Sequence, residues 1–139
     1  MIVIAIDQGE KRLGIAISDP TGTIANPLEV LEHVSRTIDA ASIAQLAIER
    51  GAELIIIGQA LDEEDRPTAQ ARQAARLAGA IRVQTSIPVI LWDESGSTQT
   101  ARQARVAMGA PRRKRRGHMD DLAATVILQT YLDADAAER

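Results

Sequence analysis

Carboxylates at three places in the chain could support metal-dependent chemistry. Asp7 directly follows an apolar run, and so do the adjacent Asp93 and Glu94. Asp120 comes near the start of the last helical pattern. Carboxylates that converge repel one another unless a cation compensates, and oxygen ligands favour hard cations such as Mg²⁺ or Mn²⁺. Two such ions about 3.5–4 Å apart can activate water and stabilise the leaving oxygen of a phosphodiester, so this chemistry needs no serine, histidine or cysteine nucleophile.

Basic residues near Asp7 and in one later segment could contact phosphate. Gly9 would let the backbone adopt a positive φ or let a ligand approach closely, and Lys11 and Arg12 follow it. The later segment is a run of five cations, Arg112, Arg113, Lys114, Arg115 and Arg116. These are five of the 16 Lys and Arg residues, which leaves 11 elsewhere against 19 Asp and Glu. A basic patch on an acidic body is the electrostatic pattern of phosphate binding, and a solvated basic loop is the alternative.

The sequence pattern predicts a mixed sheet flanked by helices. Residues 1–6 are apolar throughout, which suits a strand covered on both faces, and residues 13–18 complete a β-hairpin with Asp7 at its mouth. Residues 24–34 predict an edge strand because they contain Pro27. The further elements expected are a helix over 37–50 capped by Thr37, a strand over 53–58, an acidic solvent-facing loop over 59–66, a helix from Pro67 to Val83, a strand over 87–92, a helix from Ser97 or Thr98 to Met108, a mobile basic loop over 109–117, and a helix over 118–133. We therefore expect one α/β domain over residues 1–139.

This topology gives a reason for the carboxylates to meet. In open α/β sheets, ligands bind outside the carboxyl ends of the strands, where Asp7 and the Asp93–Glu94 pair are expected. Because side chains alternate along a strand, only one of Asp93 and Glu94 can face the cluster, and the pattern leaves open which one. Asp121 is about 100° from Asp120 around the helix, so we expect it to be solvated, with a role as substitute for Asp120 as the alternative.

Composition excludes several kinds of site. The chain has no cysteine, so disulfides and thiolate metal sites are excluded. Trp92 and Tyr131 are its only aromatic residues, so bases can scarcely stack on the protein and any nucleic-acid grip must be ionic. The apolar runs are too short for a membrane-spanning helix, and no signal-peptide pattern is present. We expect a soluble, cytoplasmic protein with no membrane partner.

Four motifs resemble the YqgF/RuvX family of the ribonuclease H-like superfamily, small bacterial proteins related to RuvC-type Holliday junction resolvases and associated with pre-16S rRNA cleavage. They are IDQGEKRLGIAISDP from Ile6, LIIIGQAL from Leu54, ILWDESGST from Ile90 and RRKRRGHMDDLAATVILQTYLD from Arg112, and together they span nearly the whole chain. The resemblance implies an RNase H-like sheet of about five strands that begins with a β-hairpin. It also implies a nuclease that uses Mg²⁺ or Mn²⁺, with two ions, on structured nucleic acid, either precursor RNA or branched DNA.

The resemblance assigns catalytic and metal-ligand roles to the same carboxylates. The family's first acid matches Asp7, its acidic pair matches Asp93 and Glu94, and the acid that one residue separates from Leu-Ala-Ala matches Asp120. Related resolvases use a glutamate at the second place, which favours Glu94 over Asp93.

Two departures from the family pattern bear on substrate contacts. Relatives usually carry an arginine after the acidic pair, where this chain has Ser95. They usually read Gly-Leu-Pro where this chain has Gly58, Gln59 and Ala60. Neither change touches the carboxylates.

Two other functions fit parts of the pattern. A non-catalytic RNA- or DNA-binding module would keep the fold and the basic run and use the acids only for structure. An actin-like or sugar-kinase-like phosphotransferase also opens with an aspartate and a glycine-containing hairpin, but it needs two domains of this kind. A monomer and a homodimer both fit the sequence.

Overall fold

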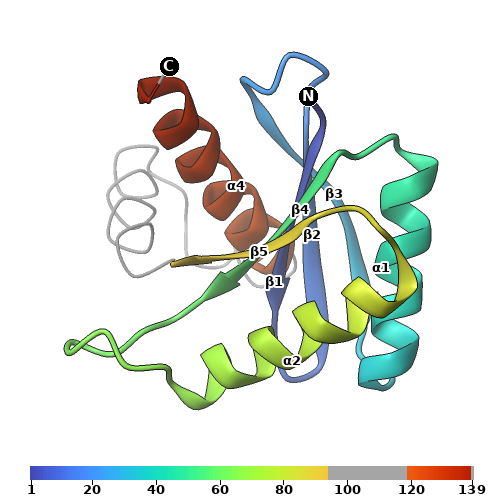
Figure 1. Ribbon diagram of the computed structural model, residues 1–139, viewed down its shortest axis with the longest axis vertical. Coiled ribbons are helices and arrows are strands. Elements are labelled where there is room, and N and C mark those ends of the chain that lie inside the picture. The colour runs from blue at the N-terminus through green and yellow to red at the C-terminus, as the bar shows by residue number, and fades with distance from the viewer. Residues whose placement is uncertain (94–118, 139) are drawn as a thin grey trace.

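Five strands form one mixed sheet, and helices cover both of its faces (Figure 1). The computed structural model describes residues 1–93 and 119–138, except the side chains of residues 119–121. The strands are β1 (Val3–Gln8), β2 (Arg12–Ser18), β3 (Ala25–Glu32), β4 (Leu54–Gln59) and β5 (Val89–Asp93), and the described helices are α1 (Arg36–Glu49), α2 (Ala69–Gln84) and α4 (Met119–Ala137). The strand order is β3-β2-β1-β4-β5, with β1 antiparallel to β2 and parallel to β4. The predicted α/β class, five-stranded mixed sheet and opening hairpin are confirmed.

The central strand β1 is buried on both faces, as its unbroken apolar run predicts. Ile4 and Ile6 pack into the core cluster that contains residues of α1 and α2. Val3 and Ala5 pack into the cluster that contains residues of α4. All four are at most 1% exposed, and full burial of an isoleucine stabilises the fold by about 1.5–3 kcal/mol. Even-numbered side chains of β1 therefore face α1 and α2, and odd-numbered ones face α4.

Two helix starts differ from the sequence prediction. The cap of α1 is Ser35 rather than Thr37, because the Ser35 side chain accepts a hydrogen bond from the Ile38 N–H at 3.2 Å. Thr68 caps α2 by accepting from the Ala71 N–H at 3.1 Å, so Pro67 lies before the helix rather than in its first turn. Pro27 lies in the edge strand β3 as predicted, opposite Ala16, where the β2–β3 register shifts.

Some predicted elements cannot be compared with the structure. The helix expected from Ser97 or Thr98 to Met108 and the basic loop expected over 109–117 lie outside the described residues.

The last helix extends to Ala137, four residues beyond the predicted end. Within the described parts of the chain, no helix combines the length and apolar character needed to cross a lipid bilayer.

The β1–β2 hairpin explains Gly9 without a positive φ. The Gly9 N–H donates to the Arg12 carbonyl at 2.8 Å, which closes a turn with Glu10 and Lys11 at its tip. A Cβ at position 9 would lie 2.9 Å from that carbonyl oxygen, closer than a real Cβ can approach backbone. The glycine is therefore needed for close backbone packing within the hairpin itself, two residues after Asp7.

The β2–β3 turn is organised by the Asp19 carboxylate. It accepts hydrogen bonds from the backbone N–H groups of Thr23 (2.8 Å) and Ile24 (2.9 Å) and from the Thr21 hydroxyl. These bonds, that of Ile24 foremost, hold the pKa of Asp19 well below its usual value. The ionised carboxylate thus stabilises the turn.

We expect Asp19→Asn to lower the free energy of unfolding at pH 7, with the difference from the unchanged protein shrinking below about pH 4. The folded pKa is depressed, so the stabilisation is complete above the unfolded Asp pKa of about 3.9 and is lost as the pH falls toward the folded value. Urea unfolding from pH 7 to pH 2 measures this difference. Glu63→Gln, in an exposed loop, is the control, and a pH-independent difference for Asp19→Asn would contradict the assignment.

We expect Gly9→Ala to destabilise the protein by about 1–3 kcal/mol, because the new methyl group must displace the Arg12 carbonyl. Gly79→Ala is the matched control, since a Cβ there meets nothing within 4 Å and replaces glycine inside α2. That change should stabilise by about 0.5–1 kcal/mol. Equal effects of the two substitutions in chemical denaturation would show that position 9 has no special need for glycine.

Candidate active site at the carboxyl edge of the sheet

Asp7 lies near the carboxyl end of the central strand, on the face that α4 covers. It pairs with Gly14 of β2, and its side chain follows Val3 and Ala5 in the alternation along β1. The residue is half-buried and makes a polar contact within the protein. The strand thus places one partly desolvated carboxylate at the edge where α/β sheets bind ligands.

Asp93 does not share this face of the sheet. Val89 and Leu91 of β5 pack with the α1 and α2 side, whereas Ile90 and Trp92 pack with α4. The Trp92 ring meets Tyr131 of α4 edge to face at a centroid distance of 5.2 Å, and its Nε1–H donates to Thr130 at 3.2 Å. Alternation therefore directs Asp93 to the side opposite Asp7. Glu94 lies outside the described residues.

The first turn of α4, which contains Asp120, lies toward the same edge as Asp7. In the second half of the helix, Gln129 accepts from the Ala25 N–H at 2.9 Å and donates to the Thr23 carbonyl at 3.0 Å. These residues lie beside the beginning of β1, so α4 runs back along the sheet from the end of that strand (Figure 1). The fold thus brings the backbone at Asp120 to the carboxyl edge.

The donor types fit a divalent cation, although only part of the predicted set is described. Asp7 supplies a half-buried carboxylate on the α4 side of the sheet. Mg²⁺ and Mn²⁺ prefer oxygen ligands, so this carboxylate suits them. Among the side chains that the structure describes, no three from His, Cys, Asp and Glu gather where they could hold a metal ion. Of the four carboxylates predicted as ligands, Glu94 and Asp120 are not among those side chains, and Asp93 is directed to the other face of the sheet.

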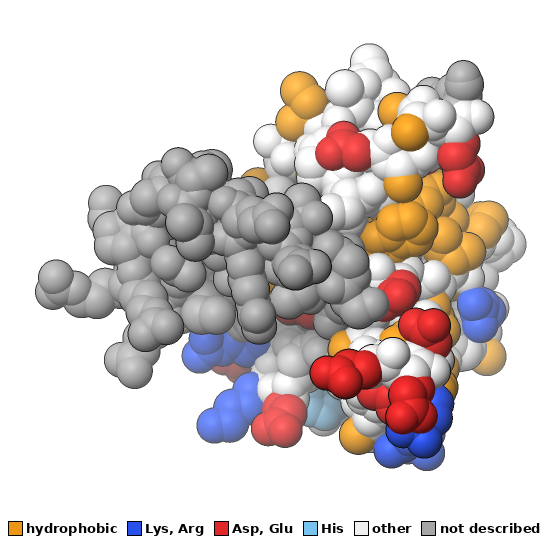
Figure 2. Space-filling model, turned by 90° about the vertical axis from the view of Figure 1, so that its left-hand side faces the viewer, with side chains coloured by type: hydrophobic (Ala, Val, Ile, Leu, Met, Phe, Trp, Pro, Cys, Tyr) orange, Lys and Arg blue, Asp and Glu red, His pale blue; other side chains and the backbone are white. Residues whose placement is uncertain are grey.

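The structure describes only some of the residues predicted to contact phosphate. Lys11 and Arg12 are exposed at the hairpin beside Asp7. Gly9 lies in the same turn, where its fit to the Arg12 carbonyl already accounts for it. The run Arg112, Arg113, Lys114, Arg115 and Arg116 lies outside the described residues. Figure 2 shows acidic side chains spread over one face of the molecule, while the Lys and Arg side chains that it colours lie mainly along its lower part.

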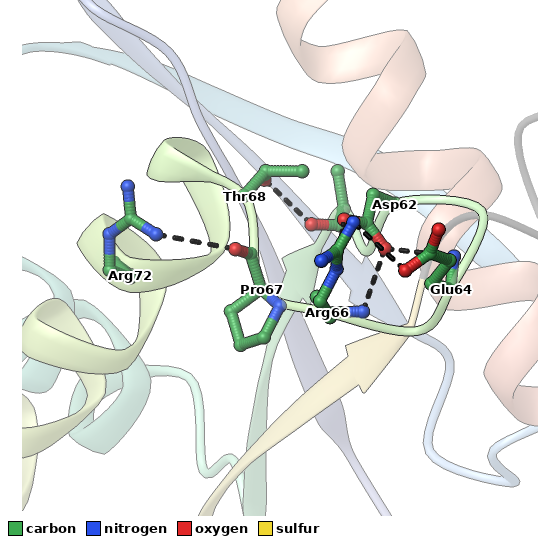
Figure 3. A network of polar contacts seen from close by, with 7 residues as sticks. Asp62, Glu64, Arg66, Pro67, Thr68 and Arg72 are labelled. Atoms are coloured by element: carbon green, nitrogen blue, oxygen red, sulfur yellow. Dashed lines mark hydrogen bonds and ion pairs between the residues drawn. The ribbon is translucent and has the colours of Figure 1, made fainter.

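The acidic loop after β4 faces solvent, as predicted, and is held by its own ion pairs (Figure 3). Asp62 accepts from the backbone N–H groups of Glu64 and Arg66, both at 2.9 Å, and from Arg66 Nε at 3.1 Å. The Arg66 backbone bond in particular holds the pKa of the Asp62 carboxyl below its usual value. Arg66 also pairs with Glu64 at 3.0 Å. Asp62 and Glu64 thus have a local cation, which makes them poor candidates for metal binding.

The departure from Gly-Leu-Pro has a structural consequence at this edge. The Ala60 N–H donates to Gln70 Oε1 at 2.8 Å, and Gln70 Nε2 donates to the Gly58 carbonyl at 3.3 Å. A proline at position 60 could not make the first bond. In this chain a side chain of α2 therefore fastens the backbone that leaves β4.

A histidine–aspartate pair near the same edge was not found from the sequence. His33 Nδ1 lies 2.5 Å from Asp39 Oδ2, and Asp39 is only 3% exposed. The other Asp39 oxygen accepts from the Val34 N–H at 3.0 Å. An aspartate in the first turn of a helix, six residues after a histidine, carries no distinctive signal, so only the folded chain reveals the pair.

Comparison with known proteins covers nearly the whole chain. Residues 1–134 match the RuvX family, described as Holliday junction resolvase. A protein of Syntrophus aciditrophicus (strain SB) named "Putative pre-16S rRNA nuclease" is 38% identical over 139 residues, which are 100% of this chain and 93% of the relative. One of the same name from Geobacillus kaustophilus (strain HTA426) is 36% identical over 136 residues, covering 96% of this chain and 99% of the relative.

Solved structures of resolvases share the fold. Thermus thermophilus RuvC in complex with a Holliday junction substrate has a TM-score of 0.59 at 18% identity, covering 97% of this chain and 96% of that one. The fowlpox virus Holliday junction resolvase has a TM-score of 0.54 at 16% identity, covering 96% and 99%. The fold is thus the RNase H-like fold of RuvC, and the match over residues 1–134 together with these relatives shows that the chain belongs to the RuvX family.

Proposed function

We propose that this protein is a divalent-metal-dependent nuclease that hydrolyses phosphodiester bonds in structured nucleic acid. The observation that carries the proposal is the position of Asp7, half-buried at the carboxyl end of β1 and on the face covered by α4. The first turn of α4 lies toward the same edge. Membership of the RuvX family supports nuclease chemistry at that edge.

The proposed ligands are Asp7, Glu94 and Asp120. Asp93 and Asp7 lie on opposite faces of the sheet, and β4 separates their strands, so about 10 Å of sheet width lies between them. Of the acidic pair, Glu94 is the one that continued alternation would bring to the side of Trp92 and Asp7. When bound, one or two Mg²⁺ or Mn²⁺ ions would supply an activated water and stabilise the leaving oxygen.

We assign nucleic-acid binding to two sets of cations. Lys11 and Arg12 lie in the hairpin beside Asp7. The basic run over 112–116 would supply most of the other positive charge that attracts phosphate. Cations neutralise phosphates whatever the base sequence, so they bind precursor RNA and branched DNA alike.

The names of the relatives favour pre-16S rRNA as the substrate, and the family description favours a Holliday junction. A cleavage panel of rRNA precursor, single-stranded RNA, duplex DNA and four-way junction, each with Mg²⁺ or Mn²⁺, decides between them. A two-fold dimer is expected if the junction is cut on two symmetric strands.

We expect Asp7→Asn to abolish cleavage and leave nucleic-acid binding intact. Losing a ligand of the metal centre costs several kcal/mol of transition-state stabilisation, so the single-turnover rate with Mn²⁺ should fall on the order of a thousandfold. We also expect Mn²⁺ to raise the melting temperature of the unchanged protein, because a ligand that binds only the folded state stabilises it, and this rise should disappear in Asp7→Asn.

Asp120→Asn should behave like Asp7→Asn, and Asp121→Asn, next to it on the helix, is the matched control. Cleavage that continues at the original rate in both Asp7→Asn and Asp120→Asn would assign the activity to a contaminant. The protein would then be a nucleic-acid-binding module that has the nuclease fold.

We expect replacement of the four arginines of the basic run by serine to weaken binding of all nucleic acids. The slope of log K against log salt should decrease by about 0.7–0.9 for each phosphate that the protein no longer neutralises. The matched control replaces four exposed arginines elsewhere, Arg36, Arg50, Arg72 and Arg76. A salt slope that changes equally in the two variants would remove the basic run from the binding surface.

A further inference from the structure

A pocket opens on the other side of β1 from Asp7, where the strand ends. It has a volume of about 570 Å³, within the range of pockets that hold small organic ligands. Gln8 directly follows Asp7 and alternates to the α1 and α2 face of the sheet. The described residues that line it are Gln8, Gly9, Glu10, His33, Ala69, Gln70 and Gln73.

His33 is held in this pocket by its contact with Asp39. The Nδ1–Oδ2 distance of 2.5 Å places one ring nitrogen against a buried carboxylate. With Nδ1 against that carboxylate, Nε2 is the ring nitrogen left for another partner. The His33 side chain is 40% exposed, so a ligand can reach it. The backbone on both sides is also fixed, because the His33 N–H donates to the Lys11 carbonyl at 2.8 Å and the Val34 N–H donates to Asp39.

Two acceptors of the described pocket remain for a ligand, and the exposed Gln73 amide adds both donors and an acceptor. Gln8 Oε1 is buried and has no hydrogen-bond partner in the described part of the chain. Glu10 adds an exposed carboxylate at the rim. The Gln70 amide is already engaged with Ala60 and Gly58.

The pocket therefore favours a ligand that donates hydrogen bonds and disfavours an anion. No Lys or Arg is among the lining residues that the structure describes, so there a phosphate group would meet the Glu10 carboxylate without a compensating cation. An exocyclic amino group, by contrast, carries two N–H donors and can bridge two acceptors. Adenine, cytosine and guanine have such a group, and uracil does not.

We propose that this pocket binds the unpaired base of one substrate nucleotide and prefers bases with an exocyclic amino group. The proposal rests on the proposed nuclease function, which brings a nucleic-acid backbone to the Asp7 edge. Asp7 and Gln8 are consecutive, so a nucleotide next to the cleaved phosphate can place its base on one side of β1 while the phosphate is held on the other. The base must be unstacked and unpaired to enter, as in most base-specific recognition of RNA.

Mononucleotides test the pocket without metal or cleavage. We expect AMP, CMP and GMP at millimolar concentration to shift the backbone NMR signals of Gln8 and Gly9 and the ring signals of His33, and UMP to bind several-fold more weakly. Ribose 5-phosphate should leave these signals unchanged. An equal response to ribose 5-phosphate would mean that the site binds phosphate, and no response to any nucleotide would show that the pocket binds no base; either result overturns the proposal.

Substitutions locate the binding within the pocket. Gln73→Ala should weaken AMP binding by about three- to tenfold, the loss expected for one hydrogen bond, and His33→Ala should do the same. Gln73 is exposed on α2, so its removal leaves the fold intact; Gln84→Ala, exposed at the other end of the same helix, is the matched control. AMP affinity that is equal in Gln73→Ala, His33→Ala and Gln84→Ala would overturn the proposal.

A series of substrates, each lacking one base near the cleaved phosphate, separates this proposal from the nuclease assignment. Removal of the base that the pocket binds should slow cleavage by the unchanged protein. The same removal should have little effect on the cleavage rate of Gln73→Ala, which has already lost part of the pocket. If Gln73→Ala responds to that position as strongly as the unchanged protein does, the base is not read by the pocket. If no substrate is cut at all, the nuclease assignment fails, and the mononucleotide titration still decides whether the pocket binds a base.

Discussion

The alternation of side chains along β1 is the constraint on which the rest of the structure depends. The strand is covered by α1 and α2 on one face and by α4 on the other, so each of its residues must fit one of two apolar clusters. A shift of one residue would exchange all of these side chains between the faces. The same constraint fixes Asp7 and Gln8 at the exit of the strand, one on each side. Chemistry on the α4 side and recognition on the α1 and α2 side can therefore be adjacent and still separate.

Polar ties hold the segments that leave the sheet near this edge. Asp39 joins the end of β3 to α1 through Val34 and His33, and Gln70 joins the end of β4 to α2 through Gly58 and Ala60. Buried or half-buried groups of this kind cost stability unless they are hydrogen-bonded, so they specify one arrangement of the backbone. In the described part of this edge, hydrogen bonds thus fix the backbone where β3 and β4 end. That rigidity is what a site needs to hold metal ligands or a base at defined distances.

The distribution of charge fits a protein that binds polyanions through one region. Outside the basic run, acids outnumber Lys and Arg by 19 to 11. Two acids of the loop after β4, Asp62 and Glu64, are already paired with Arg66. An acidic body repels nucleic acid, so a local basic segment would orient the substrate as well as attract it. In the proposed function, the cations would determine the affinity for nucleic acid, and the carboxylates at the edge would determine reactivity.

The amino-acid sequence by itself determined the strands, their burial and the family. The unbroken apolar runs of β1 and β4 predict strands covered on both faces, because every side chain in such a run must be buried. Pro27 predicts the edge position of β3, because proline has no backbone N–H to donate to a neighbouring strand. The sequence also singled out Asp7, Asp120 and the Asp93–Glu94 pair. Helix starts were harder to place: Ser35 and Thr37 are both good capping residues, and the hydrogen bond to Ile38 decides between them.

Tertiary structure decided which predicted residues share a face and which unpredicted ones meet. Asp93 is directed away from Asp7 because Trp92 packs against Tyr131, a contact between residues far apart in the chain. Gly9 is required by the Arg12 carbonyl rather than by a left-handed backbone, and Gln8, His33 and Gln73 line one pocket although three different elements or turns contribute them. Sequence spacing records periodicity within an element, whereas a site forms between elements, and the packing that sets their relative positions exists only in the folded chain.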